Sequence, residues 1–148
     1  MFKNYPVEKL AKTNYPEILN VWETSVRATH DFLNEQDIQA YKVLLDNDYL
    51  SQMQLFGVIG ELNELKGFIG IEGKKIRLLF ISPPARGTGI GKALINFVFQ
   101  HMDVREVDVN EQNTQAYDFY KYLGFETIER TSTDAIGKPF PILSMELQ

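Results

Sequence analysis

Residues 75–92 read KIRLLFISPPARGTGIGK, and this stretch decides the fold. An apolar run typical of a buried strand is followed by two prolines, by three glycines at alternate positions, and by an amphipathic helix that begins near Ile90. Glycines let the backbone bend tightly and approach a ligand, and the start of a helix presents unpaired N–H groups and a positive dipole end. The stretch therefore predicts an anion-binding turn.

The charges of the chain are distributed unevenly around this turn. The 148 residues carry a formal net charge of -5, which disfavours nucleic-acid binding. Residues 73–102 contain no aspartate or glutamate but five basic residues, so this segment is at +5 and the remainder is at -10. We expect a phosphate-bearing ligand at the turn and a cationic second ligand elsewhere, although some of the basic residues could merely solvate a strand end.

The composition limits the classes of protein and of site. A length of 148 residues with 44% hydrophobic residues fits one globular domain over residues 1–148. The absence of cysteine excludes disulfides and a cysteine nucleophile, and His30 and His101 are too far apart in sequence to suggest a metal site. Because no signal-like core and no run of about 18 apolar residues occurs, we expect a cytoplasmic protein without metal or membrane partners.

The first half of the chain has the patterns of two helices and several strands. Helices are predicted over 13–28, with Thr13 or Asn14 as the cap, and over 35–45. Residues 2–9 have a weak strand pattern. Short polar turns separate three apolar runs that predict an antiparallel meander, at 51–59, 65–72 and 75–81.

The second half predicts a crossover to a parallel strand. The helix from Ile90 precedes a short strand at 106–109, and a strand–helix–strand unit of this length places its strands parallel and adjacent. A helix from Asn113 or Thr114 is closed by Gly124, and further strands are expected at 125–131 and 142–147. The expected fold class is α/β (α+β), with a mixed, mostly antiparallel sheet of six to seven strands flanked by about four helices.

Three phosphate-binding templates can be compared with the glycine turn. The nucleotide P-loop fails because Arg86 stands where its first glycine belongs and no hydroxyl residue follows Lys92. The dinucleotide fingerprint G-x-G-x-x-G fails from both Gly87 and Gly89. Residues 86–91 are similar instead to the R/Q-x-x-G-x-G/A signature of the GCN5-related N-acetyltransferases, the GNAT family, in which backbone amides hold the pyrophosphate of acetyl-CoA.

A second motif strengthens this resemblance. Residues 113–125 match the N-x-x-A-x-x-x-Y-x-x-x-G-F segment of the same family, in the expected order after the turn. One bacterial branch, the YjaB-type acetyltransferases, is similar through three further stretches, at 25–33, 109–113 and 137–141. That branch is associated with acetylation of protein lysines, whereas the wider family acetylates many kinds of amine. The resemblance also implies the GNAT fold.

The resemblance implies acetyl-CoA as the co-substrate. The strand at 75–81 would separate from the strand at 106–109 to admit the pantetheine arm, which would be bound by main-chain groups. The glycine turn would hold the pyrophosphate. The implied cofactor-binding residues are Leu79, Phe80, Ile81, Arg86, Gly87, Thr88, Gly89, Ile90, Gly91, Lys92, Asn113, Tyr117 and Tyr120.

Tyr120 is the candidate general acid. A phenol with a pKa of about 10 can donate a proton to a thiolate leaving group. The motif position favours this role, and the alternative is a buried tyrosine with a structural hydrogen bond. Tyr117 lies one helical turn earlier and could line the same channel, although packing is the stronger expectation for it. Asn113 can cap its helix, bind the cofactor, or do both.

The general base is less evident. Some members of the family carry a glutamate on the strand before the turn, but residues 75–81 contain no carboxylate. His30 is the candidate base, since its usual pKa of about 6.5 suits proton removal, and Asp31 could orient it or bind a cationic substrate. The alternatives are a helix-end histidine with Asp31 as a cap, or proton transfer to water. His101 is expected only to complement the dipole of its helix.

Three functions are compatible with the sequence. The first is an acetyl-CoA-dependent N-acetyltransferase that acts on a primary amine by direct attack, with a protein lysine as one candidate acceptor. The second is a module that senses acetyl-CoA without turnover, and the third is an acetyltransferase for small amines such as antibiotics or polyamines. His30, Asp31 and the loop at 134–141 would select the acceptor. A monomer or a homodimer is expected.

Overall fold

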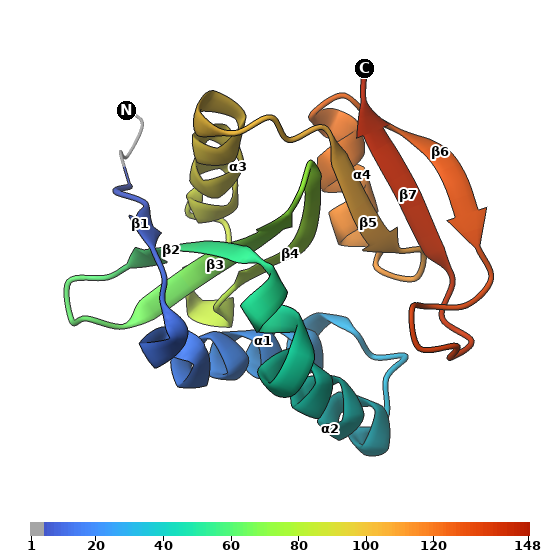
Figure 1. Ribbon diagram of the computed structural model, residues 1–148, viewed down its shortest axis with the longest axis horizontal. Helices are drawn as coiled ribbons and strands as arrows, with labels where there is room; N and C mark the ends of the chain where they lie inside the picture. The colour runs from blue at the N-terminus through green and yellow to red at the C-terminus, as the bar shows by residue number, and fades with distance from the viewer. Residues whose placement is uncertain (1–4) are drawn as a thin grey trace.

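The computed structural model describes residues 5–148 (Figure 1). The helices are α1 (Tyr15–Thr29), α2 (Glu35–Leu44), α3 (Ile90–His101) and α4 (Thr114–Tyr122). The strands are β1 (Glu8–Lys9), β2 (Gln54–Ile59), β3 (Leu65–Glu72), β4 (Lys75–Ile81), β5 (Glu106–Asn110), β6 (Phe125–Thr131) and β7 (Ile142–Leu147). Short helical turns are η1 (Lys12–Asn14), η2 (Leu45–Tyr49), η3 (Leu50–Gln52) and η4 (Pro83–Ala85).

The described strands form one mixed sheet in the order β1-β2-β3-β4-β5-β7-β6. The β4 and β5 strands are parallel, and every other pair of neighbours is antiparallel. The predicted meander and the predicted crossover through α3 are both confirmed. In Figure 1 the sheet divides into two parts, with β1–β4 on one side and β5, β7 and β6 on the other.

Two clusters of buried side chains stabilise the fold on opposite faces of β1–β4. Helices α1 and α2 cover one face and α3 covers the other (Figure 1). The neighbouring residues Phe68 and Ile69 of β3 belong to different clusters, because successive side chains of a strand point to opposite faces. The apolar stripe of α1 includes Ile18, Trp22 and Val26, whose helical spacing places them together against the sheet.

The N-terminal part differs from the sequence-based expectations. Only Glu8–Lys9 of the strand predicted at 2–9 is paired, and residues 2–4 of that prediction lie outside the described residues. Asn14 stands at the start of α1, but its side chain accepts a hydrogen bond from the Ala11 N–H at 2.9 Å and does not cap the helix. The second helix ends at Leu44 and continues as the π-helical turn η2. Local competition for hydrogen bonds decides such details.

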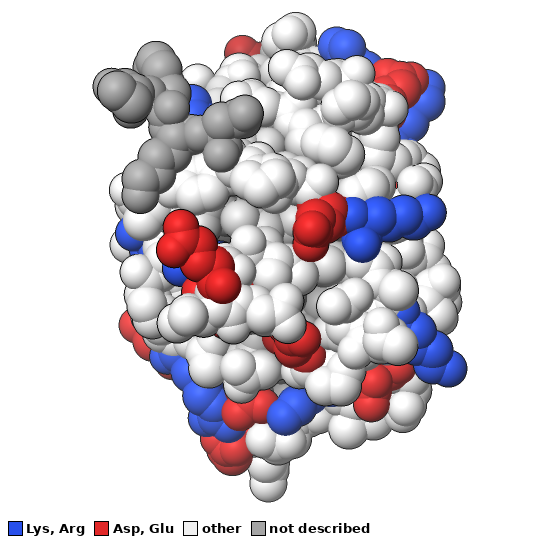
Figure 2. All heavy atoms as spheres, turned by 90° about the vertical axis from the view of Figure 1, so that its left-hand side faces the viewer, with Lys and Arg blue, Asp and Glu red and all other residues white. Residues whose placement is uncertain are grey.

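One face of the molecule carries basic and acidic side chains in small, intermixed groups. Figure 2 shows this face, which is the left-hand side of Figure 1.

In residues 5–148, no helix is long and apolar enough to cross a membrane. Within the same range, no three His, Asp or Glu side chains are grouped as metal ligands would be.

Candidate active site

A gap opens between β4 and β5 in the middle of the sheet. The two strands pair only at Lys75 with Glu106 and at Ile76 with Val107, after which β4 continues along β3 and β5 along β7. Two cavities lie at this gap. We call the cavity beside the glycine turn, of about 550 Å³, the turn cavity. We call the cavity between α1, α2, β4, β5 and the β6–β7 loop, of about 490 Å³, the split cavity.

The two cavities share a wall. The described residues that line both are His30, Leu79, Phe80, Asn113, Ala116 and Tyr120. A chemical group that reaches this wall from the turn cavity is accessible to a second molecule in the split cavity. Direct transfer of a group from one ligand to another requires the two ligands to meet in this way, because the reacting atoms must be held close together.

The turn cavity begins at the glycine turn. Gly87 and Gly89 have φ angles of 73° and 89°, in the left-handed region where other residues are strained. A Cβ atom added at Gly87 would meet nothing within 4 Å, so the space over this residue is open. Arg86 and Lys92 line the cavity on either side of the glycines. The backbone is therefore accessible between two positive side chains.

Six consecutive backbone N–H groups of this turn are unpaired. The N–H of Arg86 is paired before the turn, and pairing resumes at Ala93, whose N–H donates to the Gly89 carbonyl at 3.0 Å. Among the described residues, no N–H group from Gly87 to Lys92 has an acceptor. A row of N–H groups at the start of a helix attracts an anion. The turn therefore fits the pyrophosphate that the family resemblance implies.

Thr88 is held on the outer side of the turn. Its hydroxyl donates to the Ala85 carbonyl, and its own carbonyl accepts a hydrogen bond from the Tyr5 hydroxyl at 2.8 Å. Thr88 is not among the described residues that line the turn cavity, whereas Ile90 and Gly91 are. Its N–H group is therefore the part of Thr88 that remains available to an anion.

The main chain of β4 presents different residues to β3 and to the gap. The Ser82 N–H donates across the β3–β4 ladder at 2.8 Å, and hydrogen-bonded pairs alternate along an antiparallel ladder. The N–H and carbonyl of Phe80 therefore face β3, and those of Leu79 and Ile81 face the gap. The Ser25 hydroxyl already donates to the Ile81 carbonyl at 2.6 Å. The main-chain groups of Phe80 are therefore used by the sheet, which leaves those of Leu79 for a ligand.

Tyr120 lies at the shared wall of the two cavities. The residue is 5% exposed and packs edge-on against the Phe125 ring at 5.5 Å between centroids. Burial raises the pKa of the Tyr120 phenol above its ordinary value, so the hydroxyl keeps its proton at neutral pH. Burial is the only cause of this shift, and no hydrogen bond to another described residue contributes to it, which argues against the structural hydrogen bond considered from the sequence.

His30 also lies at the shared wall, and its hydrogen bonds define its tautomer. The Thr29 hydroxyl donates its proton to the Ser25 carbonyl at 2.8 Å and also contacts His30 Nδ1 at 2.8 Å. Because that hydroxyl has one proton, Nδ1 must be the donor, and Nε2 carries the free lone pair. Burial, followed by the positive charge of Arg86, lowers the pKa of His30 to about 4, while Asp31 opposes the shift.

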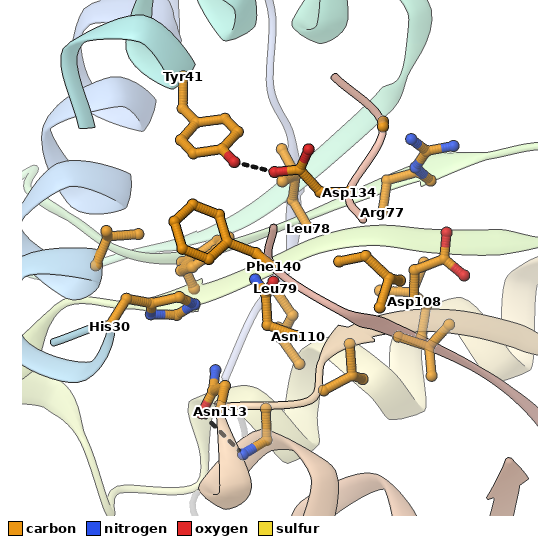
Figure 3. A pocket seen from close by; sticks show the side chains of 18 of the residues that line it. His30, Tyr41, Arg77, Leu78, Leu79, Asp108, Asn110, Asn113, Asp134 and Phe140 are labelled. Atoms are coloured by element: carbon orange, nitrogen blue, oxygen red, sulfur yellow. Dashed lines mark hydrogen bonds between the residues drawn. The ribbon is translucent and has the colours of Figure 1, made fainter. Parts of the chain in front are cut away.

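Asn113 both caps its helix and lines the two cavities. Its Oδ1 accepts a hydrogen bond from the Ala116 N–H at 3.2 Å, which Figure 3 shows at the base of the site. Because Oδ1 is used by the cap, the Nδ2 group is the part left for a ligand. The capping role expected from the sequence is therefore confirmed.

Two residues predicted from the sequence lie away from the cavities. Tyr117 packs partly buried beside the core, with the Lys121 ammonium 5.8 Å from its ring centroid. Asp31 is exposed, and the cap of α2 is Asn34 instead. Neither Tyr117 nor Asp31 is among the described residues that line the turn cavity or the split cavity.

The split cavity contains residues of the loop at 134–141, which the sequence named as part of the acceptor site, together with Tyr41 and Asp108, which the sequence did not single out. Tyr41 of α2 donates a hydrogen bond to Asp134 of the β6–β7 loop, and Phe140 of the same loop lies between them and His30 (Figure 3). Asp108 of β5 also lines this cavity. Tyr41 belongs to an apolar stripe that predicts only core packing, so its pattern carried no signal for a site.

Comparison with known proteins shows relatives over most of the chain. A family profile described as an acetyltransferase (GNAT) domain matches residues 23–147. The peptidyl-lysine N-acetyltransferase YjaB of Salmonella typhimurium is 38% identical over 132 residues, covering 87% of this chain and 88% of the relative. The peptidyl-lysine N-acetyltransferase YiaC of Escherichia coli is 30% identical over 139 residues, covering 93% and 94%.

Solved structures are similar over nearly the whole chain. The solution structure of apo-form YjaB from Escherichia coli has a TM-score of 0.85 and 32% identity, covering 95% of each chain. The PaiA N-acetyltransferase of Thermoplasma acidophilum, solved in complex with coenzyme A, has a TM-score of 0.72 and 21% identity, covering 96% of this chain and 98% of that one. The second likeness concerns the fold alone. The chain therefore belongs to the GNAT family and is an acetyl-CoA-dependent N-acetyltransferase.

Proposed function

We propose that the chain acetylates the ε-amine of lysine residues in proteins or peptides. Its relatives YjaB and YiaC are named as peptidyl-lysine N-acetyltransferases. The structural observation that supports the proposal is the meeting of two cavities at Tyr120 and His30. Arg86 and Lys92 line the turn cavity, which suits a phosphate-bearing donor, and the split cavity is left for an amine acceptor.

The donor is bound mainly by backbone. The N–H groups from Gly87 to Lys92 hold the pyrophosphate of acetyl-CoA, and the main chain of Leu79, which faces the gap, binds the arm that carries the thioester. The acetyl group then reaches the shared wall. This assignment keeps the predicted turn residues Arg86, Gly89, Ile90 and Gly91 and uses Thr88 only through its N–H.

Tyr120 serves as the general acid. The amine nitrogen forms a bond to the acetyl carbon, the carbon–sulfur bond breaks, and the departing thiolate takes the Tyr120 hydroxyl proton. Two observations support this role: burial alone raises the pKa of the phenol, so that it stays protonated, and Tyr120 lines both cavities. The tyrosine regains a proton from solvent.

His30 orients the attacking amine. His30 lines the shared wall, and its unprotonated Nε2 accepts a hydrogen bond from the amine, while a pKa of about 4 makes the imidazole a weak base. The proton released by the amine therefore passes to water and is not retained by His30. In this proposal His30, the candidate base named from the sequence, accepts a hydrogen bond from the amine, and water takes up the released proton.

Acetyl transfer to different amines tests this function. The purified chain is given acetyl-CoA with a lysine peptide whose N-terminus is blocked, with spermidine, or with an aminoglycoside, and release of CoA thiol is followed. We expect the highest kcat/KM with the lysine peptide, and mass spectrometry should place the acetyl group on the lysine. A peptide with norleucine in place of lysine is the matched control.

The other outcomes separate the alternatives. Acetyl-CoA binding without release of CoA for any acceptor would identify a sensing module. A higher kcat/KM for spermidine or the aminoglycoside than for the peptide would identify a small-amine acetyltransferase.

A further inference from the structure

The β6–β7 loop is fastened to the α1–α2 helical pair beside the split cavity. Tyr41 donates a hydrogen bond to Asp134, and the Lys138 ammonium forms an ion pair with Asp37 at 2.6 Å. The ring of Phe140 also lies 5.5 Å from the ring of Phe32. Contacts of three kinds thus hold residues 132–141 in place, and side chains of this loop have defined positions in the cavity.

The charged side chains that line the split cavity differ in their partners. Arg77 pairs with Glu72 at 3.1 Å, and Asp108 pairs with Lys75 at 3.2 Å. Asp134 has no cationic partner among the described residues. Since His30 is neutral at pH 7, the cavity holds one carboxylate whose charge is not compensated by a contact.

The hydrogen bonds of Asp134 leave it able to accept one more donor. Its Oδ1 accepts from the N–H groups of Ile136 at 3.1 Å and Lys138 at 2.9 Å, and its Oδ2 accepts from the Tyr41 hydroxyl. A carboxylate offers about four acceptor positions, so these three donors fix its orientation and leave about one position open. Figure 3 shows the Tyr41–Asp134 pair above Phe140, on the side of the cavity away from Asn113.

We propose that Asp134 captures the ammonium group of the acceptor at the entrance of the split cavity and that Tyr41 positions it. This inference rests on the proposed lysine acceptor. A carboxylate favours the charged form of an amine, whereas attack on the thioester requires the neutral form. Asp134 therefore acts in binding, and the amine loses its proton further inside, near His30.

The opposite charges of the two cavities support this division. Arg86 and Lys92 are the ionised side chains among the described residues that line the turn cavity, and the split cavity has the uncompensated Asp134. A donor with phosphates and an acceptor with an ammonium group are thus each attracted to a different cavity. The arrangement also keeps the cationic acceptor away from the pyrophosphate site.

The test is the variant Asp134→Asn, which keeps the shape of the side chain and removes its charge. With the blocked lysine peptide at pH 7.5, we expect KM to rise about tenfold and kcat to change little, because a charge-assisted contact made before the reaction is lost. A second peptide carries an aminooxy group in place of the lysine amine, and this group is neutral at that pH. Its KM should be the same for the variant and the wild type.

Two further variants show whether position or charge is responsible. Tyr41→Phe removes one of the three donors, so KM for the lysine peptide should rise less than in Asp134→Asn. Asp46→Asn removes an exposed carboxylate that follows α2 and lies outside both cavities, and KM should equal that of the wild type. Binding of acetyl-CoA should be equal in all of these proteins.

The results that contradict the inference differ from those that contradict the proposed function. If the wild type acetylates the lysine peptide and Asp134→Asn leaves KM unchanged, or raises it equally for the lysine and aminooxy peptides, Asp134 does not capture the ammonium. If the wild type does not acetylate the lysine peptide at all, the proposed function is wrong.

Discussion

The turn cavity and the split cavity are built in different ways. The anion-binding part of the turn cavity is one continuous segment, residues 85–92, with unpaired backbone N–H groups, and residues of α1, β4 and α4 complete the cavity around it. The split cavity is assembled from side chains of α1, α2, β4, β5 and the β6–β7 loop, which are far apart in the sequence. A site made of local backbone can be recognised from a short pattern, whereas a site made of distant side chains appears only when the chain is folded.

The two cavities also differ in what a substitution can disturb. In the turn cavity a change of residue acts mainly through backbone conformation, because Gly87 and Gly89 adopt left-handed φ angles. In the split cavity it acts through single charges and hydrogen bonds, as between Tyr41 and Asp134. Variants at the shared wall and in each cavity therefore test whether donor and acceptor are bound independently.

The largest effect is expected at the shared wall. Tyr120→Phe should lower kcat by about 1000-fold and leave acetyl-CoA affinity nearly unchanged, because it removes the proton donor and keeps the ring. Release of CoA thiol and calorimetric binding measure the two quantities. Tyr117→Phe, one helical turn earlier, should stay close to the wild type. Equal losses of kcat in the two variants would mean that Tyr120 is not the acid.

The next largest effect is expected in the turn cavity. Gly87→Asp should weaken acetyl-CoA binding by about 100-fold, because it strains a residue with positive φ and places a carboxylate beside the phosphate site. Gly137→Asp is the matched variant, since Gly137 also has a positive φ of 81° and open space around it. Calorimetry should show normal acetyl-CoA affinity for Gly137→Asp. Equal losses would contradict the separation of the two cavities.

A smaller effect is expected in the pH dependence of stability. Because the pKa of His30 falls from its ordinary 6.5 to about 4 on folding, the unfolded chain binds a proton that the folded chain does not as the pH falls below about 6.5. The free energy of unfolding should therefore fall by about 2 kcal/mol between pH 7 and pH 5. Urea unfolding should show that His30→Leu loses less stability than the wild type over this interval. Parallel curves would show that the pKa of His30 is the same in the folded and the unfolded chain.

The smallest effect is expected at the ion pair of the β6–β7 loop. Lys138→Met removes the contact with Asp37, whose pKa is held below its usual range chiefly by the hydrogen bond from Lys138. The Lys138 side chain is partly exposed, so solvent screens the ion pair, and KM for the lysine peptide should rise by about fivefold or less. Steady-state kinetics measure this change. A rise in KM for acetyl-CoA instead would mean that the loop serves the donor.

The sequence predicted the architecture well because its signals were local. Alternation and helical spacing identified the elements, and the short β3–β4 connection and the α3 crossover determined how the strands pair. The closing of α4 by Gly124, which has a φ of 103°, was also predictable, since glycine adopts this conformation without strain. The errors were small shifts at helix and strand ends.

The candidate site was predicted in part. Residues of the turn and Tyr120 belong to family motifs, and the structure brings them to the cavities. Tyr117 and Asp31 were named because they are near motif residues in sequence, but helix rotation directs Tyr117 elsewhere and Asp31 lies on the surface. Ser25 and Tyr41 had no signal, because their partners lie 56 and 93 residues away.

Short-range patterns were enough to predict the elements, their order and the anion-binding turn, because those properties depend on residues within a few positions of one another. Contacts between distant segments were needed to show that the two cavities share a wall, that Phe80 uses its main-chain groups in the sheet, and that the lone pair of His30 is on Nε2. They were also needed to show that Asp134 lies in the split cavity without a cationic partner among the described residues. These features depend on burial and on contacts between distant segments, which no local pattern records.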